Sequence, residues 1–353
     1  MRGRITGSLV LLLLAGHPAA APAKEVDSFT YRYEILALPE GEFDGRPVTD
    51  FAPVLDPLVN RIVDRTLRRL NGENQRAGRS CDSRRARKRL FYKLRHALAG
   101  PMIVTRNRLR KVIDRHPNRV EIPLKRSVYR DFPIWKSPTL AMVSRVYDVM
   151  ADAFRFDLGP TPILVSSDKI THFFNRSQRL FDRLSAGGPA DLDRVLAYNQ
   201  KLEGSIWGTK ATGVAAWGDL VANFNGMRFW IHLLGKDVRG NPLTDPLADL
   251  GEEGIDPLVR CTADGWEKAR EFTFKSYLDP AWDEGLNCSD FRHPVFLEAL
   301  HRRIEELRQN DPQGRFYGCP MDPDLIRRAA VRYGPYADRL INREGHRVYH
   351  PED

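Results

Sequence analysis

Apolar residues recur at three- and four-residue steps along much of the chain, and this spacing limits the fold more than any other feature. The first such stretch ends at Asn71-Gly72 and has apolar residues at Leu55, Leu58, Val59, Ile62, Val63, Leu67 and Leu70. This is the period of a helix with one buried face. Similar patterns predict helices over residues 83–100, 105–115, 137–154, 166–184, 190–203, 219–235, 296–308 and 320–333. Only residues 120–122 and 162–165 resemble strands, so we expect a mainly α protein.

The first 23 residues have the features of a secretory signal. Arg2 and Arg4 precede an apolar run over residues 9–14, and Ala21-Pro22-Ala23 offers a small-residue cleavage site. The run is too short to span a bilayer, and we expect no transmembrane segment in the mature chain. The alternative is an N-terminal anchor that stays uncut. The sequence therefore predicts a periplasmic or secreted protein.

Four cysteines remain in the mature chain, at positions 81, 261, 288 and 319. An even number in an exported protein favours disulfides, and three pairings are open. Of these, a bond between Cys288 and Cys319 would hold the C-terminal segment in place.

The chain carries a formal charge of +9, and much of the excess lies before residue 130. Residues 79–95 alone contain Arg84, Arg85, Arg87 and Lys88 among other cations. Export argues against nucleic acid as the partner. The cluster is then either a solvated helix face or a surface that meets an anionic envelope polymer or lipid headgroups.

Residues 202–230 place two carboxylates on either side of a turn rich in Gly and Thr. Glu203 ends one predicted helix at Gly204, and Asp219 opens the next. A helix C-terminus and apolar neighbours raise the pKa of an acid, whereas the first turn of a helix stabilises a carboxylate. Glycoside hydrolysis needs this division between an acid and a base. The alternative is that Asp219 is an ordinary helix-start residue and that Glu203 is simply a solvated residue at a helix end.

Other candidate residues surround this pair. Asn223 offers an amide to sugar hydroxyls, and the ring of Trp217 could stack on a pyranose, although such aromatic residues are often core. Asp168 and His172 lie four residues apart on one predicted helix, either as substrate-binding residues or as a local hydrogen bond. The acidic pair Asp283-Glu284 either closes the cleft around the two carboxylates or lies in an ordinary solvated loop.

Sequence motifs for several other enzyme classes are absent. The chain contains no GxSxG, HExxH, P-loop or GxGxxG pattern, and no histidine lies at metal-ligand spacing from another His or Cys. We therefore expect neither a metal nor an organic cofactor.

Three blocks together resemble a family of exported proteobacterial proteins. They are DKITHFF from residue 168, the segment from Glu203 through TGV to DLVANFNGMRFW, and WDEGLNCS from residue 282. One branch of this family is similar to the lysozyme of predatory bacteria that cuts de-N-acetylated peptidoglycan. The resemblance implies a lysozyme-like helical core with extra N- and C-terminal helices, and Glu203 as the general acid. Thr212-Gly213 lies at the distance from the acid that lysozymes in general show, and we include Thr212 among the sugar-binding candidates.

The chain departs from the family at one position. Family members usually carry Ser-Tyr where this chain has Ala216-Trp217, and Trp has no hydroxyl that could act as a base. We expect Asp219 or a water to take the second role, or activity to be lost.

The sequence thus predicts a glycosidase acting on peptidoglycan or a related amino-sugar polymer. The alternative is a non-catalytic envelope protein that binds glycan or anionic polymer. The expected organisation is a signal (1–23), a basic helical region (24–158) and a catalytic region (159–353), the last two also being compatible with one compact domain.

Overall fold

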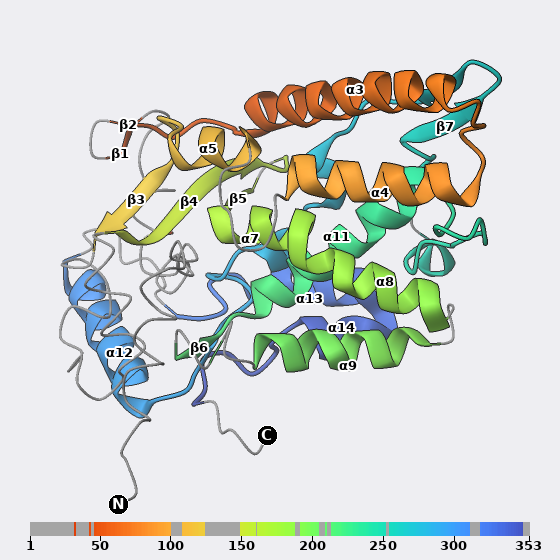
Figure 1. Cartoon of the computed structure of the whole chain (residues 1–353). Coiled ribbons are helices and arrows are strands. Elements are labelled where there is room, and N and C mark those ends of the chain that lie inside the picture. The colour runs from red at the N-terminus through yellow and green to blue at the C-terminus, as the bar shows by residue number, and fades with distance from the viewer. Residues whose placement is uncertain are drawn as a thin grey trace, which may run out of the picture.

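The computed structural model of the protein describes residues 32, 42–43, 46–99, 108–123, 149–159, 161–187, 191–204, 209, 213–251, 254–310 and 318–348. Helices dominate this part of the chain, which confirms the predicted mainly helical class (Figure 1). The helices are α3 (Ala52–Arg76), α4 (Arg84–Leu98), α5 (Arg108–Asp114), α7 (Ser167–Thr171), α8 (Ser177–Gly187), α9 (Leu192–Glu203), α11 (Trp217–Leu234), α12 (Pro294–Gln309), α13 (Pro323–Tyr333) and α14 (Ala337–Leu340). The strands are β1 (Glu42–Phe43), β2 (Arg46–Pro47), β3 (Val120–Pro123), β4 (Val149–Asp157), β5 (Pro162–Val165), β6 (Val214–Ala215), β7 (Val259–Thr262), β8 (Gly265–Lys268) and β9 (Asp290–Phe291). The predicted signal lies outside the described residues.

Helix α11 forms the centre of the molecule. It is buried along nearly its whole length and packs against α8, α9 and a π-helical turn at His172–Arg176 (Figure 1). Gly226 allows the closest approach, because a Cβ there would lie 2.1 Å from the carbonyl oxygen of Phe173. Trp230 donates a hydrogen bond from Nε1 to Ser177 Oγ at 3.2 Å. These contacts hold the middle of α11 against the π-helical turn and the start of α8.

A three-stranded antiparallel sheet has the order β3-β4-β5. The helix predicted over residues 137–154 is therefore wrong at its C-terminal end, where β4 begins at Val149, and residues 137–148 lie outside the described part. Phe154 and Phe156 are buried on one face of β4, and the neighbouring Ala153 is buried on the other. Arg155 and Asp157 on that other face are only partly buried, so the strand alternates apolar and polar residues over its last four positions. The predicted helix extends to the first residue of this short alternating stretch.

The predicted domain boundary at residues 158–159 falls in the hairpin between β4 and β5. Asp157 pairs with Pro162 directly across this turn. A contiguous hydrophobic core contains buried residues from both sides of it, from Phe51 to Ile341.

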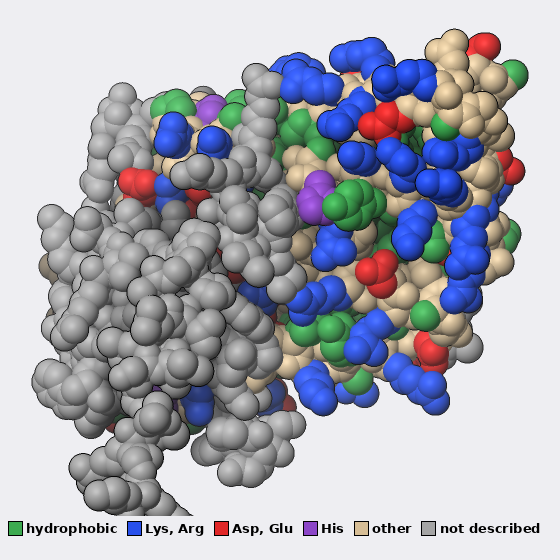
Figure 2. Space-filling view, viewed as in Figure 1, with side chains coloured by type: hydrophobic (Ala, Val, Ile, Leu, Met, Phe, Trp, Pro, Cys, Tyr) green, Lys and Arg blue, Asp and Glu red, His purple; other side chains and the backbone are tan. Residues whose placement is uncertain are grey.

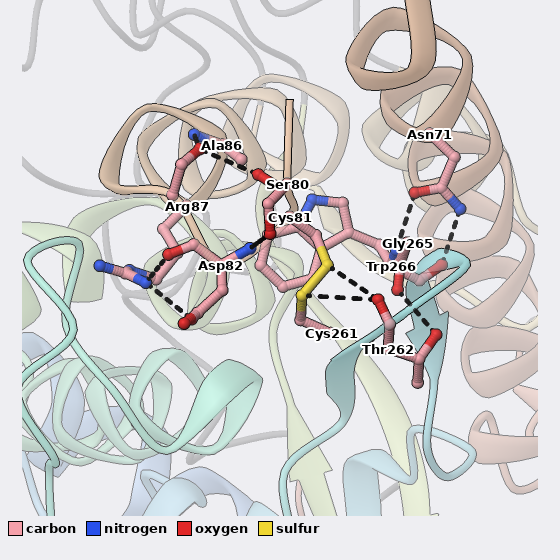
Figure 3. Close-up of a disulfide and its surroundings, with 11 residues drawn as sticks. Asn71, Ser80, Cys81, Asp82, Ala86, Arg87, Cys261, Thr262, Gly265 and Trp266 are labelled. Atoms are coloured by element: carbon pink, nitrogen blue, oxygen red, sulfur yellow. Dashed lines mark hydrogen bonds and ion pairs between the residues drawn. A yellow bond between two sulfur atoms is a disulfide. The ribbon is translucent and has the colours of Figure 1, made fainter. Parts of the chain in front are cut away.

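Helix α3 packs against the β7–β8 hairpin, which comes from a distant part of the chain (Figure 3). Asn71 accepts a hydrogen bond from the Trp266 amide and donates one to its carbonyl, both at 2.8 Å. The expectation that Asn71-Gly72 ends this helix is wrong, since α3 continues to Arg76. Cys81 and Cys261 form a disulfide beside these contacts (Figure 3).

The second disulfide joins Cys288 to Cys319, so the structure selects one of the three pairings that the sequence left open. Two residues after Cys288, Asp290 of β9 pairs with Ala215 of β6 in a short antiparallel ladder. This pairing brings the start of α11 next to the segment around residue 290. Among the described helices, none combines the length and the apolar character that a membrane crossing requires.

Candidate functional site

Glu203 is the last residue of α9, and its carboxyl group is buried with only 5% of the residue exposed. Gly204 follows as the cap, and Thr209 donates a hydrogen bond from Oγ1 to the Glu203 carbonyl at 3.0 Å. On the side chain, Oε1 accepts the Ala216 amide at 3.4 Å, whereas Oε2 has no hydrogen-bond partner among the described residues. The predicted helix-end glutamate is thus confirmed in position, and one of its oxygens is left for a ligand or water.

Burial raises the pKa of Glu203 from 4.5 to about 7. The positive charge of Arg176 and the hydrogen bond from Ala216 oppose this rise, while the charge of Asp168 adds to it. A carboxyl group with this pKa is protonated in a large fraction of molecules near neutral pH. It can therefore donate a proton to a leaving oxygen.

Glu203 lines a cavity of about 460 Å³ between α9, the start of α11 and the C-terminal segments. The volume lies in the range of small-ligand sites. Its lining residues are Ala197, Gln200, Lys201, Glu203, Gly204, Ala215, Ala216, Trp217, Leu220, Asp290, Arg339 and Arg347. A wider opening of about 600 Å³ beside Arg328 and Arg332 is lined by none of the predicted site residues.

Asp290 is a second carboxyl group at this cavity, and sequence reasoning missed it. Its Oδ2 accepts a hydrogen bond from Trp217 Nε1 at 2.9 Å and lies 3.2 Å from Nε of Arg347. Asn342 donates to the other oxygen at 3.1 Å. Burial raises the pKa of Asp290, and the bonds from Trp217 and Arg347 oppose that rise. Asp290 reaches the cavity through the β6–β9 pairing, which joins segments distant in sequence, so no local sequence pattern indicates its position.

Trp217 is half-buried and lines the cavity with its ring edge tied to Asp290. The hydrogen bond fixes the orientation of the indole. A fixed aromatic surface in a polar cavity is suited to stacking against a sugar ring. The prediction that Trp217 faces a ligand site is consistent with this geometry.

Asp219 occupies the first turn of α11, as predicted, but it is not among the residues that line the cavity. Its Oδ2 lies 3.3 Å from Nε2 of His172, and its Oδ1 lies 3.9 Å from Nζ of Lys169. The same His172 nitrogen lies 3.3 Å from Oδ2 of Asp168. Asp219 and the pair Asp168–His172 therefore form one buried cluster.

This cluster contains the atoms of a three-ligand metal site. One oxygen or nitrogen from each of Asp168, His172 and Asp219 lies within 4.8 Å of the others. Cationic side chains already surround the carboxylates, however. Burial by itself raises the pKa of Asp168, but His172, Arg176 and Arg110 together hold it well below its usual range. We assign the cluster as an ion-pair network that needs no metal to balance its charge.

Lys169 extends this network to the acidic pair at positions 283 and 284. Its Nζ lies 2.7 Å from Oε1 of Glu284, while Oδ2 of Asp283 accepts the Leu164 amide at 2.8 Å and contacts Arg32. Both acids are buried. Asp283 and Glu284 are therefore not part of a solvated loop, and neither lines the cavity. They hold α7 and β5 against the loop that contains them.

Of the two remaining sugar-binding candidates, only Asn223 lies in the described part of the chain, and it does not line the cavity. Asn223 is 1% exposed and donates to Asn199 Oδ1 at 2.9 Å, which joins α11 to α9. Thr212 lies outside the described residues. The comparisons with known proteins found no matching family model, no matching curated protein and no matching solved structure.

Proposed function

We propose that the protein is an exported glycoside hydrolase that cleaves the glycan strands of peptidoglycan, with Glu203 as the general acid. The observation that carries this proposal is a buried carboxyl group with a pKa of about 7 at the edge of a cavity of about 460 Å³. Such a group can protonate the glycosidic oxygen as the bond to the sugar breaks. The proposed mechanism uses no metal and no organic cofactor.

Asp290 is the carboxyl group best placed for the second role. It lines the same cavity as Glu203 and is held by Trp217 and Arg347. When ionised, it can activate a water or stabilise positive charge on the sugar ring. Asp219, the partner expected from sequence, acts in this proposal through the network. It fixes His172, which in turn fixes Asp168, and the charge of Asp168 raises the pKa of Glu203.

The proposed substrate follows from the cavity lining and from the family resemblance. Trp217 offers a ring for stacking, Lys201 and Arg339 can meet carboxylates of the stem peptides, and Asp290 can meet a free amino group. A free amine is what distinguishes de-N-acetylated from acetylated glycan. Two disulfides fit an oxidising compartment outside the cytosol, in keeping with the proposed periplasmic or secreted location. A lysozyme-like arrangement of the helices around Glu203 is part of the same proposal.

The test is digestion of purified sacculi in acetylated and deacetylated forms, with the soluble fragments identified by mass spectrometry. The wild-type protein should release fragments with new reducing sugar ends, and Glu203→Gln should release at least ~100-fold less. Glu298→Gln, an exposed change on α12, serves as the matched control. Fragments cut only in the peptide stems, or equal release by Glu203→Gln, would refute the proposal.

A non-catalytic role is the second candidate, because exposed cations are concentrated on the N-terminal helices. In that case the protein binds glycan or an anionic polymer without cutting it. Retention of the protein on sacculi with no released fragments would favour this candidate.

A further inference from the structure

Lys and Arg side chains gather on one face of the molecule, over α3, α4 and α8 (Figure 2). Helix α4 alone has the sequence RRARKRLFYKLRHAL, with seven Lys or Arg residues and no Asp or Glu. Helix α3 packs against α4 and adds further arginines. The fold therefore concentrates positive charge from segments that are separate in sequence.

Six of these cations define what we call the basic face: Arg61, Arg65 and Arg68 of α3, and Arg84, Arg85 and Lys88 of α4. All six are exposed. In α3 the three cations are spaced at four and three residues. In α4, Lys88 lies four residues after Arg84 and three after Arg85, so each set covers one broad side of its helix. Among the residues that the structure describes, none makes an ion pair with any of the six. The nearby Glu73 is instead shared by Arg69 at 3.1 Å and Arg89 at 2.5 Å.

This arrangement opposes the stability of the helices that carry it. Arg61 and Arg65, like Arg84 and Lys88, are like charges four residues apart, which disfavours a helix. Arg84 and Arg85 also occupy the first turn of α4, where the helix dipole disfavours positive charge. A negatively charged partner would remove both penalties.

We propose that the basic face is a docking surface for an anionic phospholipid bilayer. The cations are spread over the outer sides of two helices, which suits a planar array of phosphate headgroups. Tyr92 lies on α4 with 55% of its surface exposed, and its ring is 4.2 Å from that of His96. An exposed tyrosine is suited to a headgroup region, because its ring is apolar and its hydroxyl is polar. The disulfides argue against nucleic acid as the partner, since they fit an oxidising compartment.

None of the six residues of the basic face lines the cavity that contains Glu203. Helix α9, which ends at Glu203, lies at the opposite end of the molecule from α3 (Figure 1). The inference itself does not depend on the proposed hydrolase activity.

The test is co-sedimentation of the protein, purified after export in its oxidised form, with vesicles of phosphatidylcholine alone or mixed with phosphatidylglycerol. Binding should require the anionic lipid. It should also weaken as ionic strength rises from about 0.1 M to about 1 M, because the screening length falls from about 10 Å to about 3 Å. Each cation near the surface contributes about fivefold to binding. The triple variant Arg65→Gln, Arg68→Gln, Lys88→Gln should therefore partition about a hundredfold less.

A second triple variant, Arg308→Gln, Arg327→Gln, Arg343→Gln, removes the same charge elsewhere. These three side chains are 66%, 72% and 59% exposed and pair with nearby acids. This control should bind as the wild type does, and circular dichroism should show both variants folded. Equal binding to neutral vesicles, or equal losses in the two variants, would overturn the proposal. So would binding to soluble polyphosphate through the same three residues with no binding to vesicles.

Discussion

Replacing Glu203 by Gln should change how stability depends on pH. A glutamate in the unfolded chain ionises near its model value of 4.5, whereas burial raises the pKa of Glu203 in the folded protein to about 7. A carboxyl group whose pKa is raised by folding contributes stability that is complete below pH 4.5 and is lost as pH rises through about 7. The difference between the two pKa values corresponds to about 3 kcal/mol. Gln cannot ionise, so the variant escapes this loss.

The assay is urea unfolding of the oxidised wild type and Glu203→Gln at a series of pH values from about 4 to about 8.5. All other titrating groups are shared, so their effects largely cancel in the difference. Relative to wild type, the free energy of unfolding of Glu203→Gln should rise by up to about 3 kcal/mol between the acidic and alkaline ends. Glu298→Gln should follow the wild type throughout. A difference that is constant with pH, or that falls as pH rises, would show that folding does not raise the pKa of Glu203.

Three further predictions concern the surrounding fold. In urea unfolding, His172→Ala should lower the free energy of unfolding by about 3 kcal/mol, because it leaves buried carboxylates without their imidazole partner. A loss under about 0.5 kcal/mol, as at an ordinary surface site, would argue against the network. Gly226→Ala should lower the free energy of unfolding by about 1–3 kcal/mol through overpacking. Gly72→Ala should instead raise it by about 0.5–1 kcal/mol, because an added Cβ there meets nothing within 4 Å. Equal effects of the two changes would contradict the close contact of α11 at Gly226. Replacing Cys81 and Cys261, which are 180 residues apart, by Ser should cost about 5 kcal/mol on thermal or urea unfolding, and an unchanged stability would show that the bond does not form.

Local patterns were sufficient for much of the helical fold. The apolar spacing before Gly204 located the end of α9, and Ser83 was correctly placed at the start of α4, where it accepts the Ala86 amide. These features depend on residues close in sequence, so a single chain reveals them.

The features that local patterns missed depend on contacts between distant segments. Strand β4 alternates apolar and polar residues only over residues 154–157, and its place at the centre of the sheet depends on pairing with β3, which lies about 30 residues earlier. Asn71 resembled a helix stop, yet its side chain binds Trp266 while the helix continues. For the same reason no sequence pattern indicated that Asp290 lines the cavity beside Glu203. Asp219 is near it in sequence, but the β6–β9 pairing brings Asp290 to the cavity instead.

Proton donation by Glu203 is the step on which the proposed cleavage of a glycan strand depends. The most direct measurement is the rate at which new reducing ends appear in purified sacculi, followed across pH for the wild type and Glu203→Gln. The wild-type rate should fall as pH rises through about 7, where Glu203 loses its proton, and the folded variant should be inactive. Wild-type rates in folded Glu203→Gln, or the same pH dependence in both proteins, would show that Glu203 is not the proton donor.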